Sequence, residues 1–153
     1  HTTMGIEKDI QQENFRSIYQ KLSINLIFSN NWITEKIKAV LQEEDITHQQ
    51  YNILRILRGS KKPLSTLQIR ARMLDKMSDT SRIVERLVKK ELVEKKVCET
   101  DKRLVDVVIS PTGLDVLKRL DEKNKELDAI LQNLSPKEAA QLSDLLDKMR
   151  VSI

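Results

Sequence analysis

Apolar residues in the first third of the chain recur at three- and four-residue steps, which is the spacing of one helix face. The series runs from about Ile10 to Leu41 and predicts a long N-terminal helix. Ser29, Asn30 and Asn31 lie in its middle and are poor helix formers. The pattern therefore allows either a continuous helix or one with a kink at these positions.

Three short helices are predicted next, each opened by a capping residue. Thr47 and Ser65, each followed three residues later by Gln, have the pattern of a capping box. Ser78 is expected to cap the third of these helices, over residues 78–90, whose apolar positions recur on one face.

The hydrophobic period then changes from helical to extended. Residues 93–98 and 104–109 are rich in β-branched side chains and are joined by a polar loop, residues 99–103, which predicts a β-hairpin. Pro111 opens a helix of about 22 residues, roughly 33 Å long. Ser135 and the residues after it launch a final helix. The expected fold is mainly α with a small β-hairpin.

Positive charge is concentrated in the middle of the chain. The 153 residues include 27 Lys and Arg and 23 Asp and Glu, a net charge of +4. Residues 55–103 hold 15 basic and 7 acidic side chains, a net charge of +8, whereas residues 1–54 and 104–153 each have a net charge of −2. Such a segment is typical of a surface that binds a polyanion, although charge-rich surfaces also fluctuate by chance.

Three short helices and a hairpin, which together include the basic segment, describe a winged helix-turn-helix, whose third helix lies in the DNA major groove. With Ile83 and Leu87 facing inward, polar side chains spread over its outer face. Arg82 is the first choice for reading base edges, whereas Glu85 and Lys89 are interpreted as solvated surface residues. The predicted DNA-binding set on this helix is Ser78, Asp79, Thr80, Ser81, Arg82 and Arg86.

The hairpin tip adds a second predicted contact. Lys102 and Arg103 stand on a short protruding loop, where a guanidinium can enter a narrow minor groove. Asp101 is placed to brace Arg103 and completes the predicted DNA-binding set.

Residues from about 45 to 120 resemble the MarR family (multiple antibiotic resistance regulators) of bacterial transcription factors. The likeness rests on Ser81-Arg82 in the third helix, Asp101-Lys102-Arg103 in the wing, and the turn from Ile109 to Gly113. Lys102 replaces an Arg of the family pattern, and Glu91 stands where the family usually has Gly. The resemblance implies that Arg103 inserts into the minor groove and that Asp101 orients the wing. A left-handed Glu91 would cost roughly 1 kcal/mol relative to Gly.

The resemblance also implies a dimer built from the N-terminal helix and the last two helices. Long helices with apolar faces at both ends of the chain agree with a two-fold homodimer, because a small central core would leave those faces exposed. Two recognition helices would then read a pseudo-palindrome whose half-sites lie about 10 bp apart. The expected organisation is a tag remnant at 1–5, dimerisation regions at 6–44 and 111–153, and a DNA-binding domain at 45–110.

Members of this family commonly release DNA when they bind small aromatic or phenolic molecules. All the aromatic residues of this chain lie in its first 51 residues, some of them at four-residue spacing. They are candidates for an effector pocket, with a core or dimer interface as the alternative. The set is Phe15, Tyr19, Phe28, Trp32 and Tyr51.

Other chemistry finds little support in the sequence. The single cysteine, Cys98, excludes an internal disulfide, and with His48 it is the only soft or borderline ligand outside the tag remnant. No metal site or cofactor is predicted, and redox sensing at Cys98 is disfavoured. There is no Gly-rich phosphate loop and no nucleophile with a spaced base, so an enzyme is not expected.

The sequence thus predicts a DNA-binding transcriptional regulator, interpreted as a homodimeric repressor released by a small ligand. No apolar run approaches the roughly 20 residues of a membrane span, so a cytoplasmic protein is expected. The alternative is a winged-helix module that binds a protein partner instead of DNA.

Overall fold

The computed structural model describes residues 5–152 of the chain, so most of the expected tag remnant lies outside the described residues. The chain divides into two compact units, residues 1–36 and 37–153, which are described separately below. Among the described residues, no helix is long and apolar enough to cross a membrane.

The first unit contains the short helix α1 (Ile6–Asp9) and most of α2 (Ile18–Leu41). The prediction that the long helix begins near residue 10 is wrong, because Gln11 adopts a left-handed backbone with φ 54° and the chain is non-helical up to Ser17. Ser17 Oγ accepts the amide of Gln20 at 3.1 Å and so caps α2. The helix runs unbroken through residues 29–31, so the continuous helix is the alternative that the structure shows.

The second unit carries the end of α2, a one-turn 3₁₀ helix and the rest of the secondary structure. Its mainly helical composition confirms the expected fold class. The elements are η1 (Gln42–Glu44), α3 (His48–Gly59), β1 (Leu64–Ser65), α4 (Thr66–Arg72), α5 (Thr80–Lys89), β2 (Val93–Val97), β3 (Val105–Ile109), α6 (Pro111–Asp121), α7 (Asn124–Ala129) and α8 (Pro136–Met149).

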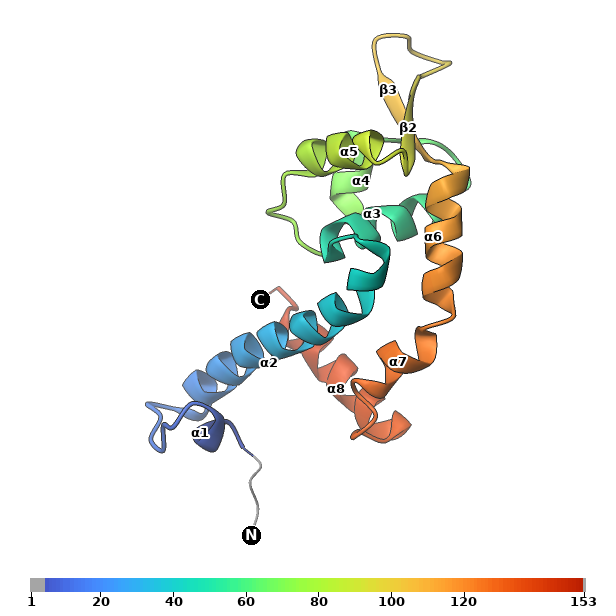
Figure 1. Ribbon diagram of the computed structural model, residues 1–153. Coiled ribbons are helices and arrows are strands. Elements are labelled where there is room, and N and C mark those ends of the chain that lie inside the picture. The colour runs from blue at the N-terminus through green and yellow to red at the C-terminus, as the bar shows by residue number, and fades with distance from the viewer. Residues whose placement is uncertain (1–4, 153) are drawn as a thin grey trace. The chain divides into compact units, whose positions relative to one another are not determined.

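The sheet has three antiparallel strands in the order β1-β3-β2, one more than the predicted hairpin. The short strand β1 pairs Leu64 with Val107, and β2 pairs Val93 with Ile109 through Val97 with Val105. Figure 1 shows the β2–β3 hairpin extending away from the helices of this unit. The far end of the hairpin is therefore free to contact another molecule.

Capping explains where several helices begin. The capping boxes predicted at Thr47 and Ser65 are both present, as is a third at Ser135. The apolar faces that these helices bury meet in one core, which includes the fully buried Ile53, Leu87, Val107 and Leu117 from α3, α5, β3 and α6. Both α5 and the β2–β3 hairpin therefore pack against the same core.

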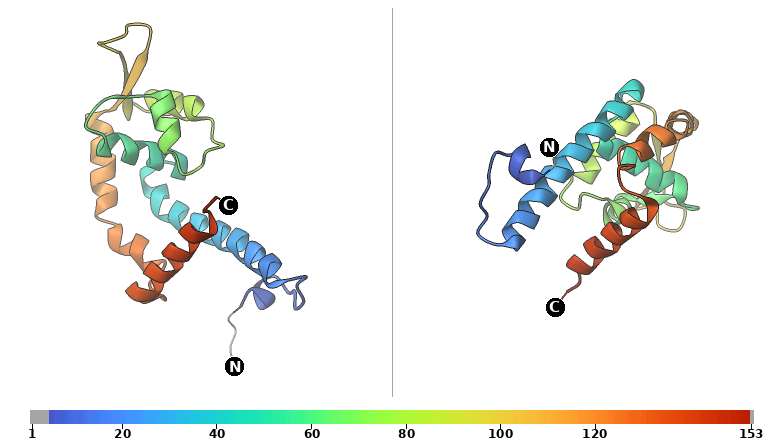
Figure 2. Two further views of the ribbon diagram at one scale, coloured as in Figure 1. Left: turned by 180° about the vertical axis from the view of Figure 1, so that it is seen from behind. Right: turned by 90° about the horizontal axis from the view of Figure 1, so that it is seen from below.

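The expected helix of about 22 residues after Pro111 is interrupted. Helix α6 ends at Asp121, and α7 begins at Asn124 after a two-residue turn. Neither Gly nor Pro marks the break in the sequence. Figure 2 shows α6 leading away from the base of the hairpin toward α7 and α8.

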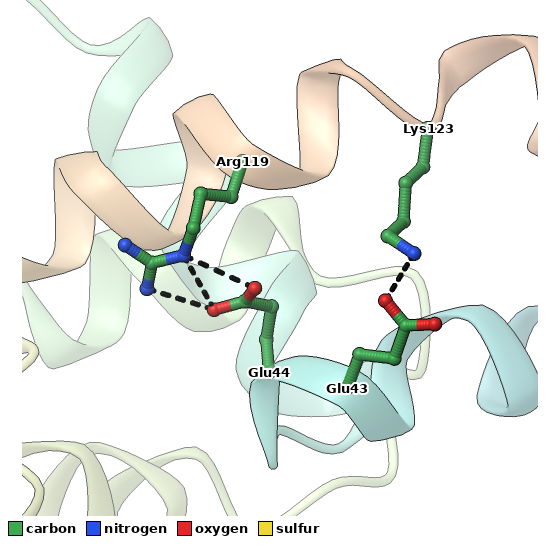
Figure 3. Close-up of polar contacts among 4 residues, drawn as sticks. All are labelled: Glu43, Glu44, Arg119 and Lys123. Atoms are coloured by element: carbon green, nitrogen blue, oxygen red, sulfur yellow. Dashed lines mark hydrogen bonds and ion pairs between the residues drawn. The ribbon is translucent and has the colours of Figure 1, made fainter.

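Ion pairs fasten the end of α6 to the segment that follows α2. Arg119 makes a bidentate pair with Glu44 of η1, with Nη2 2.8 Å from Oε1, and Lys123 pairs with Glu43 (Figure 3). The hydrogen bond to Glu44 raises the pKa of Arg119 above its ordinary value, and the bond to Glu43 raises that of Lys123. On the neighbouring face, Arg58 of α3 pairs with Asp121.

Candidate nucleic-acid interface

Helix α5 presents a sharply divided surface. Its inward face buries Ile83, Val84 and Leu87 in the core. The side chain of Asp79 caps the helix by accepting the amide of Arg82 at 3.1 Å. Five exposed side chains form the outer face, namely Ser81, Arg82, Glu85, Arg86 and Lys89.

Two residues of the predicted DNA-binding set, Ser78 and Thr80, are buried. Ser78 does not cap the helix, because its hydroxyl donates to the carbonyl of Asp75 at 2.9 Å in the preceding turn. Thr80 is only 3% exposed, and its Oγ1 is buried without a hydrogen-bond partner. Of the three hydroxyl side chains in the predicted DNA-binding set, Ser81 is therefore the exposed one.

The hairpin tip places a braced arginine far from the core. Arg103 donates from Nε and Nη2 to the two carboxylate oxygens of Asp101, at 3.0 Å each, and its side chain remains 89% exposed. This hydrogen bond lowers the pKa of Asp101 and raises that of Arg103. The expected bracing of Arg103 by Asp101 is thus present, and Lys102 is exposed beside it.

The end of α5 leads into the hairpin through a Schellman turn. The amide of Glu91 bonds to the carbonyl of Val88, and that of Leu92 bonds to the carbonyl of Leu87. Glu91 has φ 62°, so it adopts the left-handed conformation that glycine favours. A further ion pair joins Glu85 of α5 to Lys95 of β2, so the residue interpreted as merely solvated links the helix to the wing.

Sequence reasoning missed a hollow between α4 and the start of α5. Its wall includes Thr66, Leu67 and Arg70 from α4, and Met77 and Ser81 from the other side. Arg70, Arg72 and Lys76 are all exposed on or just after α4, inside the basic segment 55–103. The sequence signal for these three basic residues is their clustering on and just after the second short helix.

The aromatic residues proposed for an effector pocket are divided between the two units. Phe15 precedes α2 rather than lying on it, and the Lys21 ammonium sits 5.9 Å from its ring centroid. Tyr19, Phe28 and Trp32 are exposed on α2. Tyr51 lies on α3, where it packs against the core and the Arg55 guanidinium lies 5.6 Å from its ring centroid.

The remaining reactive side chains are isolated. Cys98 is partly buried, with Sγ 3.2 Å from Thr100 Oγ1. Burial, reinforced by the charge of Arg55, lowers the pKa of His48 at the start of α3. Within residues 5–152, no group of three or more His, Cys, Asp or Glu side chains is arranged to hold a metal ion.

Residues 44–104 match the MarR family, a stretch that runs from η1 to the hairpin tip. No curated protein matches the chain.

Solved structures share the fold over nearly the whole chain. A mutant of MarR from E. coli in complex with operator DNA is 22% identical, with a TM-score of 0.81, and the match covers 91% of this chain and 100% of that one. RdhR, an organohalide-sensing transcriptional regulator bound to 2,4-dichlorophenol, is 19% identical with a TM-score of 0.80, covering 91% and 85%. BpsR from Bordetella bronchiseptica, whose DNA binding is regulated by 6-hydroxynicotinic acid, is 19% identical with a TM-score of 0.74, covering 92% and 100%.

Proposed function

We propose that this chain is a winged helix-turn-helix transcriptional regulator of the MarR family, which its residues 44–104 match, and that it acts as a homodimer that binds a pseudo-palindromic DNA operator. In this proposal α5 enters the major groove of each half-site and the hairpin tip reaches the adjoining minor groove. The half-sites lie about 10 bp apart, one helical turn of DNA.

One observation carries the proposal: two exposed basic surfaces, the outer face of α5 and the hairpin tip, project from one basic segment and are connected to each other. Ser81, Arg82 and Arg86 are exposed on α5, and Arg103 is exposed at the hairpin tip, where it pairs with Asp101. The Schellman turn and the Glu85–Lys95 ion pair connect the helix to the hairpin. A reader whose parts are fixed before binding loses less conformational entropy on binding.

The homodimer is supported by apolar side chains that have no cover in the described chain. The N-terminal part of α2 exposes Tyr19, Phe28 and Trp32, and α8 exposes Leu145 and Met149. Exposed apolar faces of this kind mark interfaces between subunits. We therefore retain residues 6–44 and 111–153 as the proposed dimerisation regions and residues 45–110 as the proposed DNA-binding domain.

Release by a small aromatic effector is the finer part of the proposal. Two proteins of the same fold are described with such molecules, 2,4-dichlorophenol for RdhR and 6-hydroxynicotinic acid for BpsR. By analogy, this chain is proposed to repress transcription until an aromatic ligand binds.

Selection from a random pool of duplexes tests the function and supplies the operator. We expect enrichment of an inverted repeat, with a complex of two chains per duplex by light scattering. Repeating the selection with phenol- and pyridine-carboxylic acids tests release by an effector. Recovery of unrelated sequences, or of a complex with one chain, would contradict the proposed mode of binding.

A further inference from the structure

Two large apolar side chains are exposed beside the N-terminus of α5. Leu67 on α4 is 76% exposed and Met77, in the loop before α5, is 92% exposed. A single exposed apolar residue on a surface is ordinary. These two differ because both line the same hollow, together with Ser81 of the outer face of α5.

The other groups around the hollow limit what it can receive. Thr66 and Ser81 bring hydroxyls and Arg70 brings a guanidinium, all of which suit a polar ligand such as the edge of a base. Asp79 also lines the hollow, and its carboxylate offsets the charge of Arg70, so the lining carries no net charge that would attract a phosphate group. The hollow therefore favours a neutral group with an apolar part.

The major groove of a DNA duplex offers one such group, the C5 methyl of thymine. The hollow opens beside the helix that is proposed to enter that groove, and it lies in the segment of net charge +8 that attracts the duplex. An apolar protein partner would gain nothing from that surrounding positive charge.

We propose that Leu67 and Met77 are specificity-determining residues that contact thymine methyl groups at the edge of each half-site. This inference rests on the proposed function and adds the identity of a base that the hollow reads. The selected operator then carries thymine at a fixed position next to the bases contacted by Ser81 and Arg82.

Uracil substitution tests the inference, since deoxyuridine lacks only the methyl group and pairs as thymidine does. Each thymine of the selected operator is replaced in turn, symmetrically in both half-sites, and the affinity of the full chain is measured. For one thymine position we expect a loss of about fourfold per half-site, which is the equivalent of one buried methyl group.

Three variants identify the residues responsible. Leu67→Ala and Met77→Ala are expected to shrink the preference for thymine over uracil, and the double variant to abolish it, with the uracil duplex still bound. Leu74→Ala is the matched control, because Leu74 is 72% exposed in the same loop but does not line the hollow. It is expected to keep the full preference.

The possible results separate this inference from the function on which it rests. Tight binding with no uracil effect at any position overturns the inference and leaves the proposed function standing. So does a uracil effect that survives in the double variant or disappears in Leu74→Ala. Absence of binding to every duplex overturns both.

Discussion

The hydroxyl of Ser110 donates a 2.7 Å hydrogen bond to the carbonyl oxygen of Glu91. The same oxygen atom of Ser110 accepts the amide of Gly113 at 3.0 Å and so caps α6. One buried side chain therefore joins the end of the proposed recognition helix to the start of α6, the first helix of the proposed dimerisation region 111–153.

Replacing Ser110 by Ala is expected to lower the free energy of unfolding by about 1–2 kcal/mol. The loss combines a missing helix cap with the carbonyl of Glu91 left without its donor in a partly buried turn. Urea unfolding followed by circular dichroism measures it. Ser135→Ala removes the cap of α8 at an exposed site and serves as the control. A Ser110 effect no larger than the Ser135 effect would contradict the proposed double role.

A methyl group at position 113 is expected to destabilise the fold at least as much as the loss of the Ser110 hydroxyl. A Cβ built on Gly113 would lie 2.3 Å from the carbonyl oxygen of Leu92 and 2.8 Å from Ile109 Cγ1. Gly113→Ala should therefore destabilise the fold by about 1–3 kcal/mol, despite the better helix propensity of Ala.

Gly59→Ala is the matched control for that substitution. A Cβ at Gly59 meets nothing within 4 Å, and this residue also lies in a helix. We expect it to be neutral or to stabilise by up to about 1 kcal/mol. Equal effects of the two substitutions in thermal unfolding would show that the close approach at Leu92 is not a constraint.

Local signals in the sequence were enough to predict most helix starts. The capping boxes at Thr47 and Ser65 form as predicted, because each depends only on residues within one turn. The start of α5 was predicted one residue early, since the Ser78 hydroxyl bonds backward to Asp75 and leaves the cap to Asp79. The break after Asp121 has no local signal in the form of Gly or Pro.

Thr80→Val is expected to stabilise the chain by about 1 kcal/mol, because it removes a buried hydroxyl that has no hydrogen-bond partner. Since Thr80 is buried, DNA affinity should stay within about twofold of the parent, well below the effect of losing a base contact. Thermal unfolding and a binding titration on the selected operator measure the two quantities. A large loss of affinity in a stable variant would mean that Thr80 reaches the duplex after a rearrangement.

His48 should make the fold less stable in mild acid. Burial and the charge of Arg55 lower its pKa in the folded chain, whereas the unfolded chain has the ordinary value near 6.5. The unfolded chain therefore takes up a proton more readily as the pH falls through about 6.5, and the free energy of unfolding decreases from about pH 7 to 5.5.

The variant His48→Gln isolates that contribution. The carboxylates with lowered pKa, those of Glu7, Asp101 and Glu138, have ordinary values of 4.5 or less and titrate below this range. Urea midpoints across the range should therefore depend less on pH in the variant. An unchanged pH dependence would assign the effect to other groups.

The candidate site, like the fold, was predictable from the sequence where a contact joins near neighbours in the chain. The pairing of Asp101 with Arg103 is a contact between near neighbours in a turn, and the sequence alone indicates it. The hollow lined by Leu67 and Met77 depends on how α4 packs against α5, and no single-helix pattern contains that information. The burial of Thr80 depends on the same packing.

The central claim is that α5 and the hairpin tip grip duplex DNA, and the salt dependence of operator binding tests it most directly. The logarithm of the affinity should fall steeply with the logarithm of salt concentration, with a slope reduced by about 1 in Arg103→Ala. Arg82→Ala should cost about tenfold or more on the selected operator, and Arg58→Ala, whose guanidinium pairs with Asp121, should behave as the parent. An affinity that is indifferent to salt and unchanged in both Arg82→Ala and Arg103→Ala would contradict the claim.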